Sequence, residues 1–181
     1  DAFLHYHDLG PQLASLLKFI KWVISGKLKD FSLKDFPLEP DIDKNGSVAD
    51  TLKPNQPILV QIVKEPISTK GPRISSELSI AGRYLVLVPF SDRISISQKI
   101  GSRTEKERLR KLLQSIKPKG FGVIVRTVAE GKKVAELDKD LQSLFNRWVL
   151  MCRKIQKATY PSKVMSEVNR TGAILRDMFN D

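Results

Sequence analysis

The chain has 181 residues, of which 41% are hydrophobic and 28% charged, so it can bury one large or two small cores without disulfides or metals. Its single cysteine, Cys152, excludes an internal disulfide framework and favours a reducing compartment, for which the cytoplasm is the default. No apolar run is long enough to cross a bilayer, and 31 basic against 20 acidic residues favour a polyanionic partner.

The excess positive charge is concentrated in one part of the chain. Residues 82–133 contain 13 Lys and Arg against 4 Asp and Glu. Such clustering is typical of proteins that bind nucleic acid. The alternative is a basic surface without a partner. Within this stretch, residues 103–111 are either a solvated helix face or a guide for RNA, because Glu105 and Glu107 interrupt the basic residues.

The first part of the chain mixes one helix with short extended runs. Residues 1–8 are predicted to form a strand, and residues 11–25 carry apolar side chains at helical spacing up to Gly26. Residues 27–54 combine Pro, Gly and charges of both signs without a period, which predicts a loop that is partly disordered. Further strands are expected over residues 58–65 and 73–79.

The second part alternates strands and helices, and the whole chain is therefore predicted to be α+β with two structural units. Thr104 is expected to cap a helix that ends near Ile116, with Glu107 completing a capping box. A long helix is expected over residues 134–157, with Cys152 on its apolar stripe as a core thiol rather than a nucleophile. Strands are predicted over residues 84–88, 94–97 and 121–128, and a last helix over residues 173–179.

Two of these strands carry the residues that point to a phosphate site. The pattern predicts that Gly82, Tyr84 and Val86 lie on one face of a period-two strand, where the glycine leaves an opening beside the apolar contact that Val86 offers. Arg126 offers a planar fork of donors for phosphate oxygens, and Thr127 adds a hydroxyl. Adjacent strand residues face opposite ways, so the pair can meet one phosphate only if the strand ends or twists there. The alternative is that Arg126 pairs with a neighbouring carboxylate.

A metal site is weakly indicated at the start of the chain. His5, His7 and Asp8 provide two imidazoles and one carboxylate without further ligands, so we expect no metal there.

The ordered series of stretches along the chain resembles the ribonuclease E/G family, bacterial endoribonucleases that process and degrade RNA, and within it the ribonuclease G branch. These stretches are DAFLHYHDL, QPILVQIVKEPISTKGPRISSELS, IAGRYLVLVP, ISISQKI, KGFGVIVRT, LDKDLQSLFNRW and AILRD. The resemblance implies that residues 1–76 are a partial OB-fold β-barrel of the S-one RNA-binding type, with a loop-rich insertion at about 27–54. Residues 77–170 would be a mixed strand and helix 5′-sensor domain with a long amphipathic helix near its end, and residues 171–181 the start of a returning RNase H-like segment.

The resemblance also implies a partner and a site. The partner is single-stranded RNA with a 5′-monophosphate, held by Gly82, Val86, Arg126 and Thr127. Phe3 and Lys70 match positions that touch RNA, although by its pattern alone Phe3 reads as a core residue.

One position departs from the family pattern. Gln98 stands where some members have a supporting arginine, which makes Lys99 a further candidate for RNA contact.

The parent protein implied by the resemblance is a magnesium-dependent endoribonuclease, a homo-oligomer whose subunits are linked through zinc. This fragment would lack the catalytic domain and hold no catalytic residue or cofactor, so it should be inactive alone. Two other functions stay open from the sequence. One is an RNA-binding module that tracks the backbone without reading the 5′ end, and the other is a scaffold that binds an acidic protein.

Overall fold

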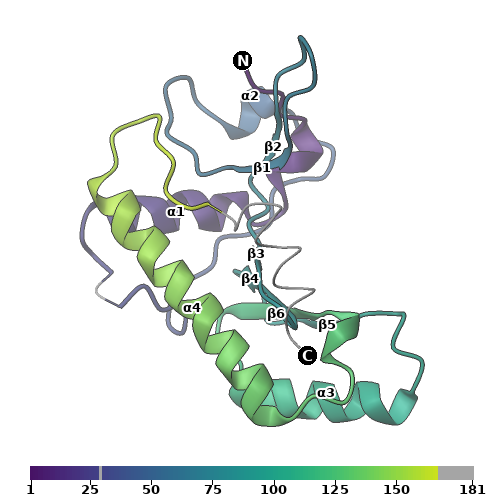
Figure 1. The fold of residues 1–181 in the computed structure, drawn as a ribbon. Coiled ribbons are helices and arrows are strands. Elements are labelled where there is room, and N and C mark those ends of the chain that lie inside the picture. Colours follow the sequence, from purple (N-terminus) through teal and green to yellow (C-terminus); the bar gives the residue numbers. More distant parts are fainter. Residues whose placement is uncertain (29, 167–181) are drawn as a thin grey trace. The chain divides into compact units, whose positions relative to one another are not determined.

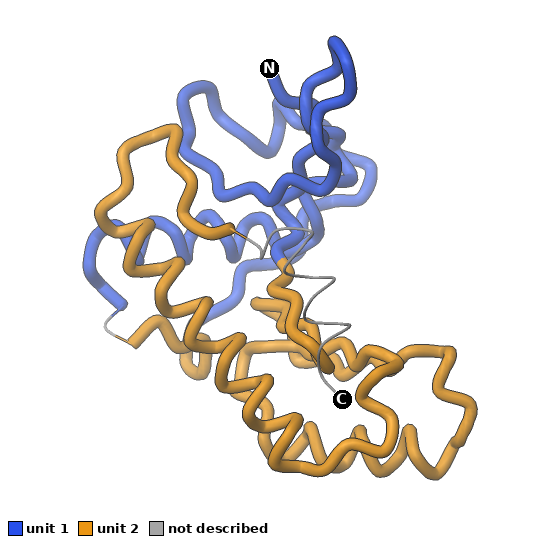
Figure 2. The backbone as a smooth tube through the Cα atoms, viewed as in Figure 1, with its two compact units in different colours: residues 1–28, 36–78 blue, residues 29–35, 79–181 orange. Residues whose placement is uncertain are grey.

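The computed structural model describes residues 1–28 and 30–166 and has the α+β class predicted from the sequence (Figure 1). These residues form two compact units (Figure 2). Unit 1 comprises residues 1–28 and 36–78, and unit 2 comprises residues 30–35 together with the described residues from Ser79 onward. The domain identities inferred from the family resemblance, with a boundary after residue 76, stay predictions. The helix predicted over residues 173–179 lies outside the described residues.

Unit 1 is built on one amphipathic helix and a small sheet. Its elements are η1 (Tyr6–Leu9), α1 (Leu13–Ile24), α2 (Val48–Thr51), β1 (Gln61–Lys64) and β2 (Arg73–Ser75). The apolar stripe of α1 is buried, as its spacing predicts, and Phe19 contacts Phe36 edge to face with ring centroids 5.6 Å apart. β1 and β2 pair antiparallel as a two-stranded sheet. The described residues of unit 1 form no closed barrel.

Two sequence predictions for unit 1 are corrected. Residues 1–8 are not a strand: Phe3 makes a single bridge to Arg73, and the chain then turns into η1. The loop predicted over residues 27–54 contains one short helix, α2, and its segment after Phe36 runs along α1. There Ser15 accepts the backbone N–H of Glu39 at 2.9 Å, and Ile42 N–H donates to the carbonyl of Pro11 at 3.0 Å. Backbone groups satisfied in this way fix a segment that has no periodic pattern.

Unit 2 contains a four-stranded mixed sheet. Its strands are β3 (Ile80–Ala81), β4 (Leu85–Pro89), β5 (Ile94–Ile96) and β6 (Phe121–Val125), in the order β3-β4-β6-β5. β3 and β4 form a hairpin, β4 and β6 pair antiparallel, and β5 runs parallel to β6. The parallel pair is connected by α3 (Arg103–Ile116), as a parallel connection requires a crossover.

Two helices cover one face of this sheet. α3 packs beside β5, and α4 (Val134–Lys157) packs against β3 and β4. The buried layer between sheet and helices includes Leu85, Leu87, Leu113, Leu141 and Trp148. Cys152 is buried there too, and burial raises the pKa of its thiol, so the prediction of a core thiol is confirmed. The other sheet face is less covered: Val86 and Val88 are half-buried, whereas Ser95 and Ile124 are exposed. We call these four residues the open face.

Residues 30–35 complete the core of unit 2. The indole N–H of the buried Trp148 donates to the carbonyl of Phe31 at 3.0 Å. Leu33 is buried against Gly120, which has a φ of +80° and no room for a side chain beside Leu33. The region predicted as an insertion at about 27–54 is thus shared between the two units rather than being one loop of the first.

Two element ends in unit 2, those of α3 and β6, differ from the sequence predictions in ways that bear on the site. α3 is capped by Ser102, whose hydroxyl accepts the backbone N–H of Glu105, and not by Thr104. β6 ends at Val125, and η2 (Thr127–Ala129) follows, so the strand does not continue to residue 128. α4 has both ends where the sequence predicts them. None of the helices in the described part of the chain is long and apolar enough to cross a membrane.

Candidate nucleic-acid interface

The turn that joins β3 to β4 is held by a carboxylate from α4. Gly82 N–H donates to the carbonyl of Leu85 at 2.8 Å and closes the turn. Asp140 then accepts three backbone N–H groups, from Arg83 at 3.1 Å and from Tyr84 and Leu85 at 2.9 Å each. A carboxylate with several backbone donors is a strong, charge-assisted arrangement. The conformation of this turn is therefore set by a residue more than fifty positions later in the chain.

This turn corrects the expectation for Gly82. The residue precedes a turn rather than sharing a regular strand with Val86, because β4 begins only at Leu85. The space beside its Cα is filled: a Cβ there would lie 2.7 Å from both carboxylate oxygens of Asp140. The glycine thus makes room for Asp140, and the opening predicted at this point is occupied. Tyr84 is buried, with its hydroxyl 3.5 Å from Glu136.

Arg126 lies directly after β6 and reaches the same turn. Its backbone N–H donates to the carbonyl of Tyr84 at 2.9 Å, so the pairing of β4 and β6 continues one residue beyond the strand. Its guanidinium Nη1 donates to the carbonyls of Gly82 at 2.8 Å and Arg83 at 3.0 Å. Asp140 thus accepts hydrogen bonds from backbone N–H groups of the turn, and Arg126 donates hydrogen bonds to two backbone carbonyls of the same turn. Through the turn, α4 fixes where the guanidinium lies.

Val86 belongs to the same side of the sheet as Arg126. Val86 pairs with Ile124 on β6, and Arg126 follows Ile124 by two residues in extended backbone with φ −78° and ψ 159°. Since alternate residues of a strand share a face, the side chains of Val86, Ile124 and Arg126 lie on the open-face side. The structure therefore brings Gly82, Val86 and Arg126 together around the turn and the edge of the open face.

Thr127 is exposed and stands where the strand has ended. Its hydroxyl lies 3.0 Å from the hydroxyl of Ser97, which follows β5. Because η2 begins at Thr127, the strand alternation that would send Arg126 and Thr127 to opposite faces stops here. Ser97 opens a short turn with the exposed residues Gln98 and Lys99. Lys99 therefore follows by two residues the serine whose hydroxyl contacts Thr127, and its part in a site stays a prediction.

An ion pair fastens the loop after η2 to α3. Glu105 receives a bidentate pair of hydrogen bonds from Arg108, both at 2.7 Å, and accepts the backbone N–H of Gly131 at 2.9 Å. Arg108 also donates to the carbonyl of Lys132 at 3.0 Å. These contacts, first of all the Arg108 hydrogen bonds, lower the pKa of Glu105 to about 2. The loop that follows Arg126 and Thr127 is therefore fixed on both sides.

In unit 1 the candidate RNA contacts are Phe3 and Lys70, which belong to neighbouring backbone segments. The side chain of Phe3 is 59% exposed, so it is not a core residue. Its backbone pairs with the segment just after Lys70: the Phe3 N–H donates to the carbonyl of Pro72 at 2.8 Å, and its own carbonyl accepts from Ile74 at 3.0 Å. Lys70 is exposed in a tight turn closed by mutual backbone hydrogen bonds with Ile67. An exposed aromatic ring and an exposed lysine on neighbouring backbone segments are groups that can contact single-stranded RNA.

Metal-binding residues do not converge in the described part of the chain. No group of three or more His, Cys, Asp and Glu is placed there to hold an ion. His5 and His7 lie with ring centroids 5.1 Å apart, while Asp8 forms a bidentate pair with Arg73 at 2.9 and 2.8 Å. The Arg73 hydrogen bonds lower the pKa of Asp8. Asp8 is therefore committed to an ion pair inside unit 1.

Sequence reasoning missed Asp140 and Ser97, which position the turn and Thr127. Asp140 lies in the LDKDL stretch among other charged residues, and only its place on the sheet side of α4, one residue before the buried Leu141, sets it apart. Ser97 is one of several serines near β5, and its pattern carries no signal. Both act across long sequence distances.

Comparison with known proteins assigns the chain to a family. The model of the ribonuclease E/G family matches residues 79–181, which is more than half of the chain. A ribonuclease E of Nostoc sp. is 38% identical over 133 residues, covering 74% of this chain and 19% of that protein. The ribonuclease G of Escherichia coli K12 is 29% identical over 176 residues, covering 97% of this chain and 32% of that protein. The chain thus spans about a fifth to a third of the relatives it matches.

A likeness to solved structures is limited to a small part of the fold. A structure of the Staphylococcus aureus RNase P protein has a TM-score of 0.29 and 22% sequence identity, over 38% of this chain and 78% of that chain. At this level the likeness supports no inference.

Proposed function

This chain belongs to the ribonuclease E/G family, and we propose that it is the RNA-binding and 5′-monophosphate-sensing part of a ribonuclease G-like single-strand endoribonuclease acting in RNA processing and decay. Its role is to dock the 5′ end of an RNA so that a nuclease domain elsewhere in the parent protein cuts downstream. We place the parent protein in the cytoplasm, where RNA is turned over and a lone buried thiol such as Cys152 stays reduced.

The observation that carries this proposal is the anchoring of Arg126. Its guanidinium is held by two carbonyls of the β3–β4 turn, beside the exposed hydroxyl of Thr127 and at the edge of the open face. A positively charged fork that is fixed before the ligand arrives loses little side-chain entropy on binding. Each charge-assisted hydrogen bond to a phosphate contributes roughly 1.5–3 kcal/mol. Two such bonds are enough for a clear preference for a terminal phosphate.

The same arrangement explains how a monophosphate would be chosen over a triphosphate. The donors are close together and the space beside Gly82 is closed by Asp140, so the site has no room behind the first phosphate. The carboxylate of Asp140 would also repel further negative charge. Val86, on the same side of the sheet, offers an apolar contact for the terminal sugar or base.

The proposal for unit 1 is a second contact to the same RNA. Phe3 would stack on a base, which contributes about 1–3 kcal/mol per base, and Lys70 would meet the backbone. Some family members have a supporting arginine at the position of Gln98. In this chain Lys99 would supply the positive charge instead. The catalytic magnesium ion and the zinc link between subunits belong, in this proposal, to other parts of a homo-oligomeric parent. We assign no catalytic residue to this chain.

The second candidate function is an RNA-binding module that tracks the backbone without reading the end. The filled space beside Gly82 favours it, because a smaller cavity leaves fewer groups around a terminal phosphate. The two functions are separated by measuring the affinity of the chain for one short oligoribonucleotide with either a 5′-monophosphate or a 5′-hydroxyl. Tighter binding of the monophosphate supports sensing, equal binding supports tracking, and no binding of either supports a protein scaffold.

Substitution of the arginine tests the site directly. Arg126→Ala should abolish the preference for the 5′-monophosphate while the 5′-hydroxyl oligonucleotide binds as before. Arg126→Lys keeps the charge but loses the fork, so it should retain only part of the preference. An unchanged preference in Arg126→Ala, with the fold intact by circular dichroism, would remove Arg126 from the site.

A further inference from the structure

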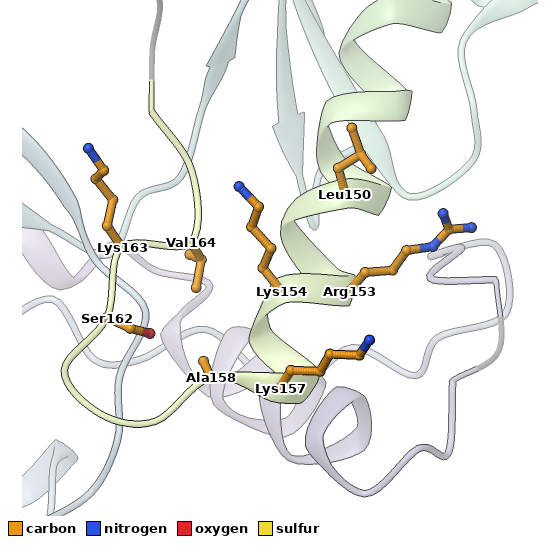
Figure 3. A pocket seen from close by; sticks show the side chains of 8 residues that line it. All are labelled: Leu150, Arg153, Lys154, Lys157, Ala158, Ser162, Lys163 and Val164. Carbon is orange, nitrogen blue, oxygen red and sulfur yellow. The ribbon is translucent and has the colours of Figure 1, made fainter.

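A hollow of about 350 Å³ lies at the C-terminal end of α4, away from the residues of the proposed sensor site (Figure 3). Its walls come from the last two turns of the helix and from the segment that follows Pro161. Four of its lining residues are cations, and apolar side chains lie between them. The cations are Arg153, Lys154, Lys157 and Lys163, and we call this feature the cationic hollow.

Three of these cations come from the last two turns of α4. Leu150, Arg153, Lys154 and Lys157 follow one another at helical spacings of three and four residues, so they extend over about 10 Å of the helix. Figure 3 shows Lys154 and Lys163 reaching in the same direction, one from α4 and one from the returning segment. Arg153 and Lys157 extend along the other flank of the helix. The positive charge is thus spread over a length, not gathered at one point.

No carboxylate among the described residues balances this charge. The described lining contains no Asp or Glu, and none of the four cations forms an ion pair within the described residues. Elsewhere in unit 2, by contrast, Arg108 and Lys117 each have a carboxylate partner. Cations near a helix C-terminus interact favourably with its dipole, but only weakly at an exposed site. Lys163 does not belong to the helix at all.

Apolar side chains also line the hollow. The side chain of Leu150 is 55% exposed, and Val164 lines the hollow from the other wall. A chain of phosphates joined by sugars matches this combination: negative charges at intervals for the cations, and sugar or base surface for the apolar residues. The helix cations from Arg153 to Lys157 extend over about 6 Å of α4, and Lys163 adds a fourth from the other segment, so a single anion would meet only some of them.

We propose that the cationic hollow binds the phosphodiester backbone of single-stranded RNA, without regard to the chemical group at its 5′ end. This rests on the proposed function in that RNA is the ligand, but it does not depend on Arg126 or on sensing. The hollow then increases the affinity for RNA, and the site at the Gly82 turn provides the preference for a 5′-monophosphate. Charge contacts of this kind release counterions, so they make binding strongly dependent on salt.

The test uses the full 181-residue chain with the substitutions Arg153→Gln, Lys154→Gln and Lys157→Gln combined. Affinities are measured for the 5′-monophosphate and 5′-hydroxyl forms of one oligoribonucleotide over a range of salt concentrations. Both affinities should fall by the same factor, and the ratio between them should not change. The slope of log affinity against log salt should become shallower by about 0.7 for each phosphate contact that is lost.

Two matched variants serve as controls. The combination Arg153→Lys, Lys154→Arg and Lys157→Arg keeps all three charges and should bind RNA like the unmodified chain. Lys139→Gln removes an exposed cation from the first half of the same helix and should leave the salt slope unchanged. Wild-type affinity and slope in the triple glutamine variant, with its helix content retained, would overturn the proposal. The proposal would also be overturned if the unmodified chain bound no RNA but did bind polyglutamate, and if the triple glutamine variant lost that binding.

The outcome is separable from that of the proposed sensing function. If the unmodified chain binds both oligonucleotides equally but the triple variant binds both more weakly, sensing fails and the hollow stands. If the preference for the monophosphate is present and the triple variant loses no affinity, sensing stands and the hollow fails.

Discussion

The carboxylate of Asp140 occupies the place that a side chain at Gly82 would take. Both carboxylate oxygens lie 2.7 Å from the position of a Cβ on that glycine, closer than a real Cβ approaches. The same oxygens accept the backbone N–H groups of Arg83, Tyr84 and Leu85. The glycine and the aspartate therefore form one structural unit, which holds the carbonyls that anchor Arg126.

Neutralising the aspartate should destabilise the turn. Asp140→Asn keeps the shape but presents an amide NH₂ where an oxygen accepts N–H groups, so at least one backbone donor loses its partner. The free energy of unfolding should fall by about 1–3 kcal/mol in urea denaturation. Asp138→Asn, two residues earlier on α4, has no such donors and should change it by less than about 0.5 kcal/mol. Equal effects of the two substitutions would refute the role of Asp140.

Adding a methyl group at position 82 should act through the same aspartate. Gly82→Ala should push the carboxylate out of the turn and lower the free energy of unfolding by an amount similar to that for Asp140→Asn. In the double variant the two losses should not add, and the coupling should be about 0.5–3 kcal/mol. Additive losses would mean that the alanine is accommodated in some other way.

The hydroxyl of Thr127 should be needed for end recognition, whereas that of Ser97 should not. Thr127→Val removes a donor of the proposed phosphate site and should reduce the preference for a 5′-monophosphate by roughly 1 kcal/mol, or about fivefold. Ser97→Ala removes only the partner 3.0 Å away and leaves the threonine hydroxyl in place. The preference should survive in Ser97→Ala, as measured with the paired oligonucleotides. A loss in both variants alike would assign Thr127 a structural role only.

The ion pair of Glu105 and Arg108 should make the stability of the protein depend on pH in the acidic range. The pKa of Glu105 is lowered from its ordinary 4.5 to about 2, so its contribution to stability is fully present above pH 4.5 and is lost as the pH falls towards 2. Glu105→Gln should therefore be less stable at neutral pH and should show a flatter fall in thermal midpoint over that range. The control is Glu107→Gln, whose partner Arg103 is almost fully exposed. Its acid profile should match that of the unmodified chain.

The sequence predicts the elements whose pattern is local and long. α4 has 24 residues with an unbroken apolar stripe, and both of its ends agree with the prediction. The sequence places the N-cap of α3 two residues too late, at Thr104 instead of Ser102, because each of these residues has a glutamate three positions later. Two identical capping signals cannot be ranked without knowing which neighbours surround them.

The turn at Gly82 could not be predicted, because its cause lies outside the local sequence. Residues 81–90 read as one extended apolar run, and nothing in them marks a turn. The turn forms because Asp140 supplies acceptors from a helix that is far away in the chain. For the same reason the bare glycine was read as an opening for a ligand, although a carboxylate fills the space. From the sequence, Arg126 and Thr127 can face one phosphate only if the strand ends before them. β6 does end at Val125.

Unit 2 is discontinuous in sequence, and this limits how the chain can be shortened. A truncated protein that starts at Ser79 would match the boundary of the family model, yet it would omit Phe31 and Leu33. The indole of Trp148 would then lose the carbonyl acceptor that Phe31 supplies, and Gly120 would lose its contact with Leu33. Such a truncation would be prone to aggregate, and supplying residues 30–35 as a separate peptide should restore its solubility.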